Sequence, residues 1–532
     1  MTRKTFLTFL ASCAASIGGA LIFRKFFQHR ISGKIVGPDK MSGHSFRDKI
    51  FQTSPSNAIQ SNVLILGGGI SGLSAGYYLS KAGFSDYTIL EMEDTIGGNS
   101  KFGENSISKY PWGSHYLPQP TSSMPFLTGF LKDAGIVIGS KPNGEPIFDE
   151  KYLCFDPDER IFIHGKWQEG LFPKLASSSE VFREKEKFEK LMNNWRKKIG
   201  RDGKKAFTIP VDFSSKDPEF LKLDQITFFE YLKIEGFQTK ELLWYAEYAT
   251  RDDYGSSLTN TSAWAGIHYY ASRAVDPKGE ELPPLTWPEG NGFLVSKLQS
   301  MTTGKIETGE VVYKVSSENS KWKVLTFNKK SNQTKLYICN SLIYSLPQFT
   351  RKYILGNNPY HNDFVYSPWM VANLTVSQVP EGRGAPTSWD NVIYNSSSLG
   401  YIVSTHQSFR FQEKKSVLTY YFPFIDDDTL ATKHKLEKKN WTDWKNFILK
   451  DLKKCHRDIE SYVENIDVML HAHAMIRPTV NFIWGKSREK SMKSIGSIHF
   501  AHSDLSGISI FEEAHFRGFA AARKALHSIN KS

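Results

Sequence analysis

The sequence predicts an α/β protein with two domains, and three observations predict it. The length of 532 residues exceeds what one hydrophobic core usually covers, so at least two domains are expected. A content of 40% hydrophobic and 23% charged residues is typical of a globular chain. A β-branched apolar run at 62–66 is followed at once by a glycine-rich turn and then by apolar residues with helical spacing at 73–79. That order predicts a strand, a turn and a helix that belong to a parallel sheet.

The charge and the cysteines exclude several classes of function. The net charge of +12 is concentrated at the N-terminus, where residues 1–60 carry nine Lys and Arg against two Asp. The rest of the chain has neither a basic stripe interleaved with aromatic residues nor zinc-finger spacing, so we expect no nucleic-acid partner. Mild positive charge fits an anionic cofactor and a membrane surface better. The four cysteines lie far apart, which predicts neither a metal or redox pair nor a disulfide framework.

An uncharged run at 5–23, with basic residues on both sides, bears on the location of the protein in the cell. A helix of this length nearly spans the hydrocarbon core of a bilayer, about 30 Å thick, and the run is also typical of an export signal. Thr2 to Leu7 resembles a twin-arginine signal, with Lys4 where the second Arg belongs. The run therefore predicts a signal or membrane anchor in residues 1–30.

This segment predicts the bacterial inner membrane or the periplasm as the location of the protein. The alternatives are a lipid attached at Cys13, or an uncleaved anchor that leaves the body of the protein facing the cytoplasm. Residues 31–54 contain Gly, Pro and Ser among polar residues, and we expect them to be a tether.

The glycine-rich turn has the spacing of a dinucleotide-binding fingerprint. Gly67 permits a tight turn, Gly69 lets the backbone approach a pyrophosphate, and Gly72 lets the helix pack closely on the strand. The start of the helix then faces the phosphate charge. A second strand at 87–90 ends in Glu91, an acid placed to accept hydrogen bonds from ribose hydroxyls. The pattern predicts a Rossmann-like domain whose phosphate contacts are Gly67, Gly69, Ile70, Ser71 and Gly72.

The residues after Glu91 distinguish between nucleotide cofactors. Thr95-Ile96-Gly97-Gly98-Asn99-Ser100 resembles the second glycine motif of the flavin-containing amine oxidase and phytoene desaturase-like superfamily of FAD-dependent oxidoreductases. Thr95 replaces the usual Arg of that motif. The resemblance implies FAD as the cofactor, with Gly97, Gly98 and Asn99 close to it.

Four later segments resemble the same superfamily. Residues 287–294 resemble its Pro-x-Gly-Gly turn, and 309–315 resemble the strand beside the adenine, which implies a contact from Val312. Residues 342–347 resemble the strand that returns to the cofactor domain, and 497–504 resemble the strand end that closes the FAD site. The resemblance implies that the acid of that strand end, Asp504, reaches the ribityl or pyrophosphate region.

The C-terminal segment resembles the helix that follows the closing strand in that superfamily. Phe511 and Glu512 stand where this helix begins, and its start would face the carbonyl end of the flavin ring. His502 and Glu513 stand where the superfamily usually has Gly.

The resemblance also implies the domain organisation. The FAD-binding domain would be interrupted and would comprise residues 55–125, 285–350 and 490–532. An α+β substrate domain would comprise 126–284 and 351–489. The substrate would enter at the interface between the two domains.

Two histidines are the candidate catalytic residues. His115 follows the second glycine motif at the distance where related enzymes pass near the flavin ring, and His473 precedes the closing strand. His471 and His473 alternate as ligands on a strand would, but no third ligand is evident, so we expect no metal. Asp252 and Asp253 are interpreted as a solvated turn or a helix cap.

Together these features predict a FAD-dependent oxidoreductase that transfers hydride from an amine or another small organic substrate to the flavin. One alternative is a flavin-dependent desaturase or isomerase of an isoprenoid or lipid, which the expected membrane anchor favours. Another is a flavin-fold protein that only binds. The sequence does not identify the electron acceptor.

Overall fold

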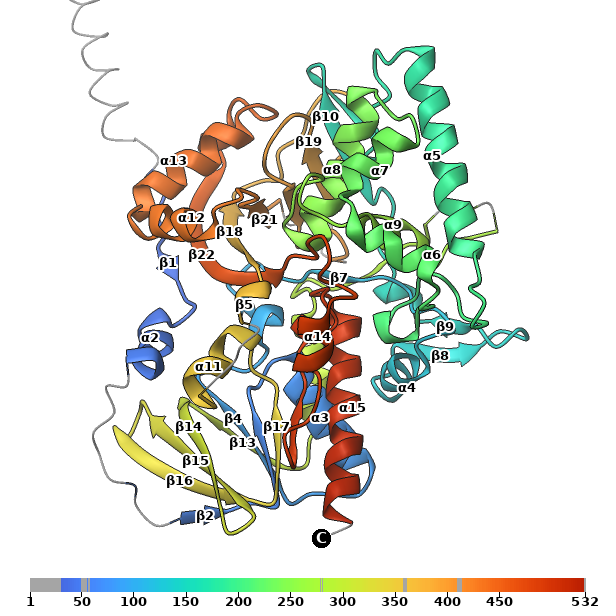
Figure 1. The fold of residues 1–532 in the computed structure, drawn as a ribbon. Coiled ribbons are helices and arrows are strands. Elements are labelled where there is room, and N and C mark those ends of the chain that lie inside the picture. The colour runs from blue at the N-terminus through green and yellow to red at the C-terminus, as the bar shows by residue number, and fades with distance from the viewer. Residues whose placement is uncertain are drawn as a thin grey trace, which may run out of the picture.

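The computed structural model shows where the expected elements lie (Figure 1). The predicted signal or anchor falls outside the residues that it describes. Within the described chain, no helix is both long enough and apolar enough to cross a bilayer. The described residues are 30–48, 55, 58–277, 279, 281–356, 361–408 and 414–530.

A parallel sheet forms the centre of the first domain and confirms the α/β fold class. In the described chain it has five strands in the order β13-β4-β3-β17-β23, and every neighbouring pair is parallel. β3 is buried along its whole length, as its apolar sequence predicts. The strands are β3 (Val63–Leu66), β4 (Tyr87–Glu91), β13 (Lys305–Thr308), β17 (Ser341–Tyr344) and β23 (Ile498–Phe500).

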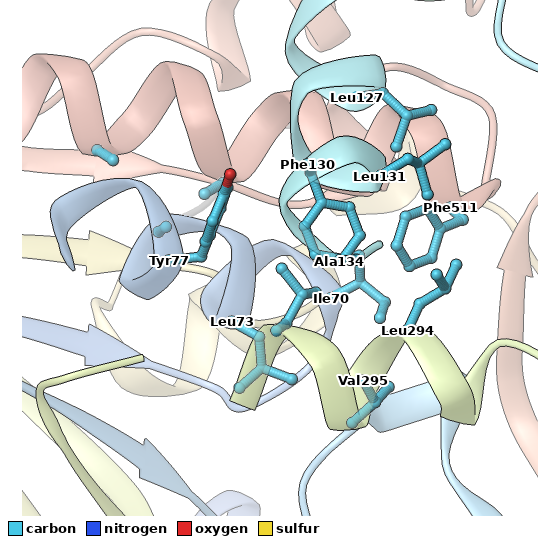
Figure 2. Close-up of a cluster of buried hydrophobic side chains, with 14 of the residues drawn as sticks. Ile70, Leu73, Tyr77, Leu127, Phe130, Leu131, Ala134, Leu294, Val295 and Phe511 are labelled. Atoms are coloured by element: carbon cyan, nitrogen blue, oxygen red, sulfur yellow. The ribbon is translucent and has the colours of Figure 1, made fainter. Parts of the chain in front are cut away.

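Helices α3 (Ile70–Lys81), α10 (Gly292–Ser300) and α15 (Phe511–Ile529) share one hydrophobic core with this sheet. Figure 2 shows Ile70, Leu294 and Phe511 meeting in that core. Helix α4 (Pro125–Asp133) contributes Phe130 and Leu131 to it. The domain boundary expected at 125 thus falls at the start of a helix that packs on the cofactor-domain side.

A smaller sheet extends the first domain below the parallel one (Figure 1). Its described strands run in the order β14-β15-β16-β2. The pairing of β14 with β15 shifts register between Val312 and Lys314. The strands are β2 (Ala58–Gln60), β14 (Glu310–Glu318), β15 (Lys321–Asn328) and β16 (Gln333–Cys339).

The second domain is built on a larger mixed sheet, with eight strands in the described chain in the order β1-β22-β18-β21-β20-β19-β10-β11. Trp444 and Ile448 of helix α13 pack on one face of it, against Met370 and Ile466. The strands are β1 (Ile35–Val36), β10 (Glu159–Ile163), β11 (Lys166–Glu169), β18 (Tyr366–Val376), β19 (Asp390–Ile393), β20 (Gly400–Val403), β21 (Ser416–Pro423) and β22 (Val463–Ile476), and the helices beside them are α12 (Thr429–Glu437) and α13 (Trp441–Leu452).

A helical layer completes the second domain and forms its own core. Its helices start at polar caps: the Ser178 side chain accepts a hydrogen bond from the N–H of Val181, and Thr227 forms a capping box with Glu230. Its helices are α5 (Ser179–Lys197), α6 (Pro218–Leu221), α7 (Phe228–Ile234), α8 (Lys240–Tyr254) and α9 (Ala263–Ala271). The remaining short elements are β5 (Phe102–Glu104), β6 (Lys109–Pro111), β7 (Tyr116–Leu117), β8 (Val137–Ser140), β9 (Pro146–Phe148), β12 (Leu285–Thr286), α11 (Arg351–Ile354) and α14 (Lys486–Ser491).

The segment expected to be a polar tether is instead partly docked on both domains. β1 pairs in parallel with β22, with Ile35 opposite Val468. Helix α2 (Lys40–Asp48) lies beside β14, and Asp39 forms an ion pair of 2.7 Å with Lys329. The sequence did not reveal this, because the partners of β1 come more than 400 residues later.

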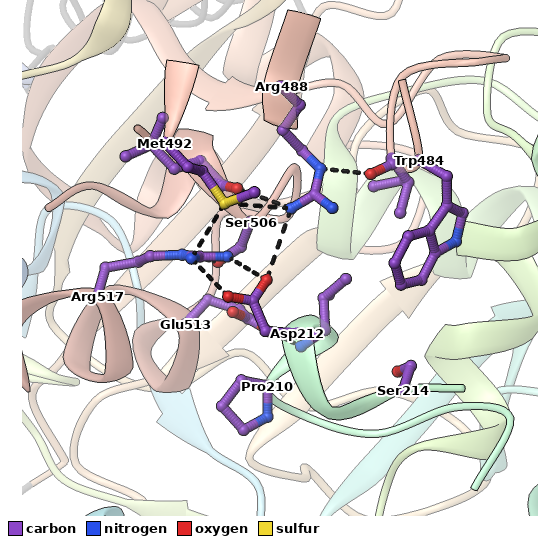
Figure 3. Close-up of polar contacts among 12 residues, drawn as sticks. Pro210, Asp212, Ser214, Trp484, Arg488, Met492, Ser506, Glu513 and Arg517 are labelled. Carbon is purple, nitrogen blue, oxygen red and sulfur yellow. Dashed lines mark hydrogen bonds and ion pairs between the residues drawn. The ribbon is translucent and has the colours of Figure 1, made fainter. Parts of the chain in front are cut away.

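A buried polar network joins α15 to the second domain (Figure 3). Asp212 accepts two hydrogen bonds of 2.8 Å from Arg517, one at each carboxylate oxygen, and its Oδ1 lies 3.8 Å from Nη1 of Arg488. Arg517 also donates to Ser506 Oγ, and Arg488 donates to Leu505 O, each at 2.8 Å. Both guanidinium groups are more than nine-tenths buried, so this one carboxylate offsets much of their charge.

Candidate functional site

The first glycine turn has the geometry that its sequence predicts. Gly67 has φ of +100°, a left-handed conformation that favours glycine. A Cβ on Gly72 would overlap the carbonyl oxygen of Gly67, so only glycine lets α3 approach β3 this closely. A Cβ on Gly69, by contrast, would meet only the Cα of Gly98, at 3.9 Å. The space beside Gly69 is therefore free of this chain's own atoms.

The second glycine turn packs directly against the first. Gly97 donates its N–H to Gly68 O at 2.8 Å, and Gly69 and Gly97 form a parallel bridge. Gly97 and Gly98 have φ of +117° and +56°, which explains why this turn also contains glycine. We call residues 67–72 and 97–99 together the glycine cradle.

Glu91 lies at the end of β4, beside the cradle. Its Oε2 accepts the N–H of Gly68 and its Oε1 accepts that of Glu93, each at 2.8 Å. Burial raises the pKa of this carboxyl, although these two hydrogen bonds oppose the effect. Within the protein, the Glu91 carboxylate thus stabilises the cradle through these hydrogen bonds. Its contact with a ribose stays a prediction.

Ile70 and Ser71 use their side chains within the protein. Ile70 is buried in the core (Figure 2), and Ser71 Oγ donates to Ala514 O at 2.9 Å, which ties α3 to α15. Among the described residues, no side chain caps the start of α3. Its first backbone N–H groups are therefore available to an anion.

Val312 and Asp504 are both held by contacts within the protein. Val312 is buried in β14, at the register shift, in one cluster with Leu90 of β4. Asp504 Oδ2 accepts hydrogen bonds from Gln348 N at 2.9 Å and from the Tyr366 hydroxyl at 2.5 Å. Burial would raise its pKa, but His502 and these hydrogen bonds lower it below the ordinary value.

Helix α15 begins beside this region with two buried acids. Phe511 packs in the core (Figure 2), so only its backbone can face a ligand. Burial raises the pKa of Glu512 to about 7, against the opposing field of Arg273. Glu513, which replaces the superfamily's glycine, accepts the N–H of Val211 at 2.7 Å. That replacement therefore anchors the helix to the second domain.

The two candidate histidines lie in different surroundings. His473, near the end of β22, stacks on Phe349 with ring centroids 4.1 Å apart, and its edge meets Tyr366. Asn99 of the cradle donates to Ala474 O at 2.6 Å, which places this strand end at the second glycine turn. The His473 side chain is nevertheless exposed to solvent at this strand end.

His115 lies among aromatic rings. Its centroid is 4.7 Å from that of Tyr421, 5.0 Å from that of Tyr116 and 5.4 Å from that of Trp389. Burial lowers the pKa of His115 to about 3. His115 is therefore neutral near pH 7, which favours hydrogen bonding or stacking over proton transfer at this position.

Two acidic residues that we expected to face solvent lie next to Tyr116. Near the end of α8, Asp253 is buried and Asp252 is partly buried, which corrects the expectation of a solvated turn or cap. The Tyr116 hydroxyl lies 3.4 Å from Asp252 Oδ2 and 3.5 Å from Asp253 Oδ1. Arg273 Nη2 lies 2.7 Å from both oxygens of Asp253. Burial, followed by the charge of Asp253, raises the pKa of Asp252 to about 7.

Two more acidic residues, on strands of the eight-stranded sheet, belong to the same group. Asp390 lies 3.3 Å from the Tyr248 hydroxyl, and burial together with the charge of Asp252 raises its pKa well above the ordinary value. Burial and then Asp158 raise the pKa of Glu159 to about 8. We call this the acidic-aromatic cluster: Tyr116, Glu159, Tyr248, Asp252, Asp253 and Asp390. One signal was present in the sequence, since Tyr248 and Asp252 are four apart in a helical stretch.

The chain itself connects the cradle to this cluster. Ser114 donates its N–H to Asn99 O at 3.2 Å and accepts that of Asn291 at 3.0 Å. The next two residues, His115 and Tyr116, reach the aromatic rings and the acids. The site thus places the glycine cradle and the acidic-aromatic cluster at the two ends of residues 97–116.

Comparisons with known proteins agree with this architecture. Residues 65–134 match a family model described as an NAD(P)-binding Rossmann-like domain. Among curated protein sequences, none matches this one significantly.

Solved structures resemble most of the chain in fold. Putrescine oxidase bound to putrescine has a TM-score of 0.64 at 14% identity, covering 88% of this chain and 100% of that one. Cyclohexylamine oxidase from Brevibacterium oxydans has 0.61 at 13%, covering 88% and 99%. A fatty acid isomerase from P. acnes that produces CLA has 0.57 at 16%, covering 87% and 98%. The chain therefore has the α/β fold of these enzymes, built around a Rossmann-like domain.

Proposed function

We propose that this protein is a FAD-dependent oxidoreductase that removes hydride from an amine. The observation that carries the proposal is the continuity between the glycine cradle and the acidic-aromatic cluster. Residues 97–116 run from one to the other, so a cofactor held in the cradle has the cluster as its neighbour. The fold shared with two amine oxidases supports the same conclusion.

The cradle fits a dinucleotide. The uncapped start of α3 and the free space beside Gly69 suit a pyrophosphate, and Glu91 suits the adenosine ribose. Val312 would lie by the adenine and Asp504 by the ribityl chain, while the backbone at Phe511 and Glu512 would face the flavin ring, as the resemblance implies. Bound FAD supplies the hydride acceptor.

The acidic-aromatic cluster fits a cationic amine. Partly buried carboxyl groups whose pKa values are raised are stabilised in their charged form when an ammonium group binds beside them, and aromatic faces attract the same charge. An ammonium group must lose a proton before it gives up hydride. Asp252, with a pKa of about 7, is suited to accept that proton on a carboxylate oxygen.

The cluster also bears on the other functions considered. An unsubstituted hydrocarbon would leave these carboxylates buried without a partner, which disfavours a desaturase or isomerase of a plain lipid chain. A protein that only binds flavin has no need of the cluster. Reduction of the flavin by substrate separates the catalytic functions from the binding one.

We predict that the purified full-length protein is yellow, releases FAD on denaturation and is bleached anaerobically by at least one primary amine. The physical reason is that the cluster holds the amine next to the hydride acceptor. Absorbance near 450 nm would be followed with a panel of mono-, di- and aminocarboxylate amines. Bound FAD that no amine and no lipid reduces would contradict catalysis. Bleaching by an unsaturated lipid alone would support the alternative instead.

The pKa of Asp252 sets a pH dependence for amine binding. The carboxyl is protonated below pH about 7 and charged above it, so affinity for a cationic amine should rise between pH 6 and 8. Asp252→Asn should remove most of this rise and weaken amine binding about tenfold or more. Amine titrations followed by the flavin spectrum at several pH values would measure this change in affinity. Asp202→Asn, at an exposed acid, is the control; an unchanged slope in Asp252→Asn would refute the assignment.

We further propose that residues 1–30 carry a signal or membrane anchor, which places the protein at the bacterial inner membrane or in the periplasm. The uncharged run at 5–23 supports this. Fractionation of cells that express the full chain distinguishes export from an anchor facing the cytoplasm.

A further inference from the structure

A pocket of about 190 Å³ opens next to the acidic-aromatic cluster, between α5, the end of α9 and two loops. Its volume suits a small ligand of a few heavy atoms. It is lined by Thr121, Ser123, Arg196, Lys205, Phe207, Thr208, Ala271, Ser272, Arg273, Ala274 and Val275.

The charge of this pocket is positive. Three of its lining side chains are cationic, none of the described lining residues is acidic, and hydroxyl groups stand between the cations. The pocket thus has the opposite sign to the cluster beside it. A pocket of this composition attracts an anion with several oxygen acceptors.

Arg196 is one of the three cationic residues that line the pocket. Its Nη2 donates to Tyr270 O at 2.5 Å and its Nη1 donates to the Asn193 amide oxygen, and both of these acceptors are neutral. Its Nε is buried and has no hydrogen-bond partner in the described part of the chain. A buried donor of this kind costs free energy unless a ligand satisfies it.

Arg273 forms the wall that the pocket shares with the cluster. Its guanidinium lies 2.7 Å from both oxygens of Asp253, 3.3 Å from the Tyr116 hydroxyl and 4.0 Å from the ring centroid of Tyr269. Its side chain is more than nine-tenths buried. An anion in the pocket would therefore compete with Asp253 for the same guanidinium.

We propose that this pocket binds a small oxyanion, a carboxylate or a phosphate, held by Arg196, Lys205 and Arg273. The oxyanion is either free or carried by the substrate. The binding site itself does not depend on the proposed amine oxidation, whereas the second experiment below rests on it. Binding would draw Arg273 away from Asp253, leave the cluster more negative and thereby strengthen binding of a cationic amine.

The first experiment measures oxyanion binding to the full-length, flavin-loaded protein by calorimetry, with acetate and phosphate at constant ionic strength. We expect saturable binding, weakened about tenfold or more by Arg196→Gln and by Lys205→Gln. Lys197→Gln and Lys204→Gln are matched controls, because these exposed neighbours do not line the pocket. No saturable binding at about 50 mM of either anion, or equal losses in the controls, would overturn the proposal.

The second experiment identifies the source of the oxyanion. Flavin reduction by an α,ω-diamine is compared with reduction by the ω-aminocarboxylate of the same length. A lower KM for the aminocarboxylate, raised by Arg196→Gln with kcat kept, assigns the oxyanion to the substrate. A diamine KM that falls when acetate or phosphate is added assigns it to a free anion. If neither substrate reduces the flavin, the proposed amine oxidation fails, while the calorimetry still decides the pocket.

Discussion

Gly69→Val is expected to yield a folded protein that has lost its flavin. The Cβ would meet only Gly98 Cα, at 3.9 Å, so the protein alone tolerates a side chain here. That side chain would fill the space where the pyrophosphate must approach the start of α3. We expect flavin content to fall to background in the purified variant, with an unchanged far-UV circular dichroism spectrum.

A matched pair of variants makes this result specific. Gly129→Val also adds a side chain to a glycine with open space around it, in helix α4 and outside the cradle, and should keep its flavin. Gly72→Val should fail differently, by misfolding, because its Cβ would overlap Gly67 O. Full flavin retention in Gly69→Val would show that the cradle is not the cofactor site.

Asp212→Asn is expected to destabilise the protein by about 2–4 kcal/mol, since it leaves the buried Arg517 and Arg488 without their shared carboxylate. Burial would raise the pKa of Asp212, but Arg517 lowers it below its ordinary value of 3.8. The contribution is therefore present above about pH 4 and lost as pH falls further. Urea unfolding at pH 7 and at pH 3 would measure both effects.

Glu145→Gln is the control for this measurement, because that acid belongs to an exposed ion pair with Lys141 and should leave stability unchanged. If Asp212→Asn unfolds at the same urea concentration as the parent protein at pH 7, the network in Figure 3 does not join the domains as described.

The cradle was predictable from sequence because its requirements are local. Gly67 and Gly72 lie within one turn of each other, and the overlap that excludes a side chain at Gly72 arises from atoms five residues away. Glu91 likewise ends the next strand, β4, which pairs in parallel with β3. Short-range geometry of this kind leaves a clear pattern in the chain.

The acidic-aromatic cluster was not predictable, because its members meet only through the tertiary fold. Asp252 lies 136 positions from Tyr116, and Tyr248 lies 142 positions from Asp390. Adjacent acids at the end of a helix usually face water, so the pair was interpreted as a turn or cap. Nothing local shows that Arg273 is present to offset the charge of Asp253.

The contact between α15 and α3 has a consequence for how the protein is made. Ser71 bonds to Ala514, and a Cβ on Gly518 would overlap Ser71 O, so the cradle helix packs against the last helix of the chain. At about 5–20 residues per second, a ribosome needs roughly half a minute to two minutes to reach it. Throughout that time the first strands and the cradle lack one of their covering layers. We therefore expect the proposed cofactor to be held only after α15 has been synthesised and has packed against α3.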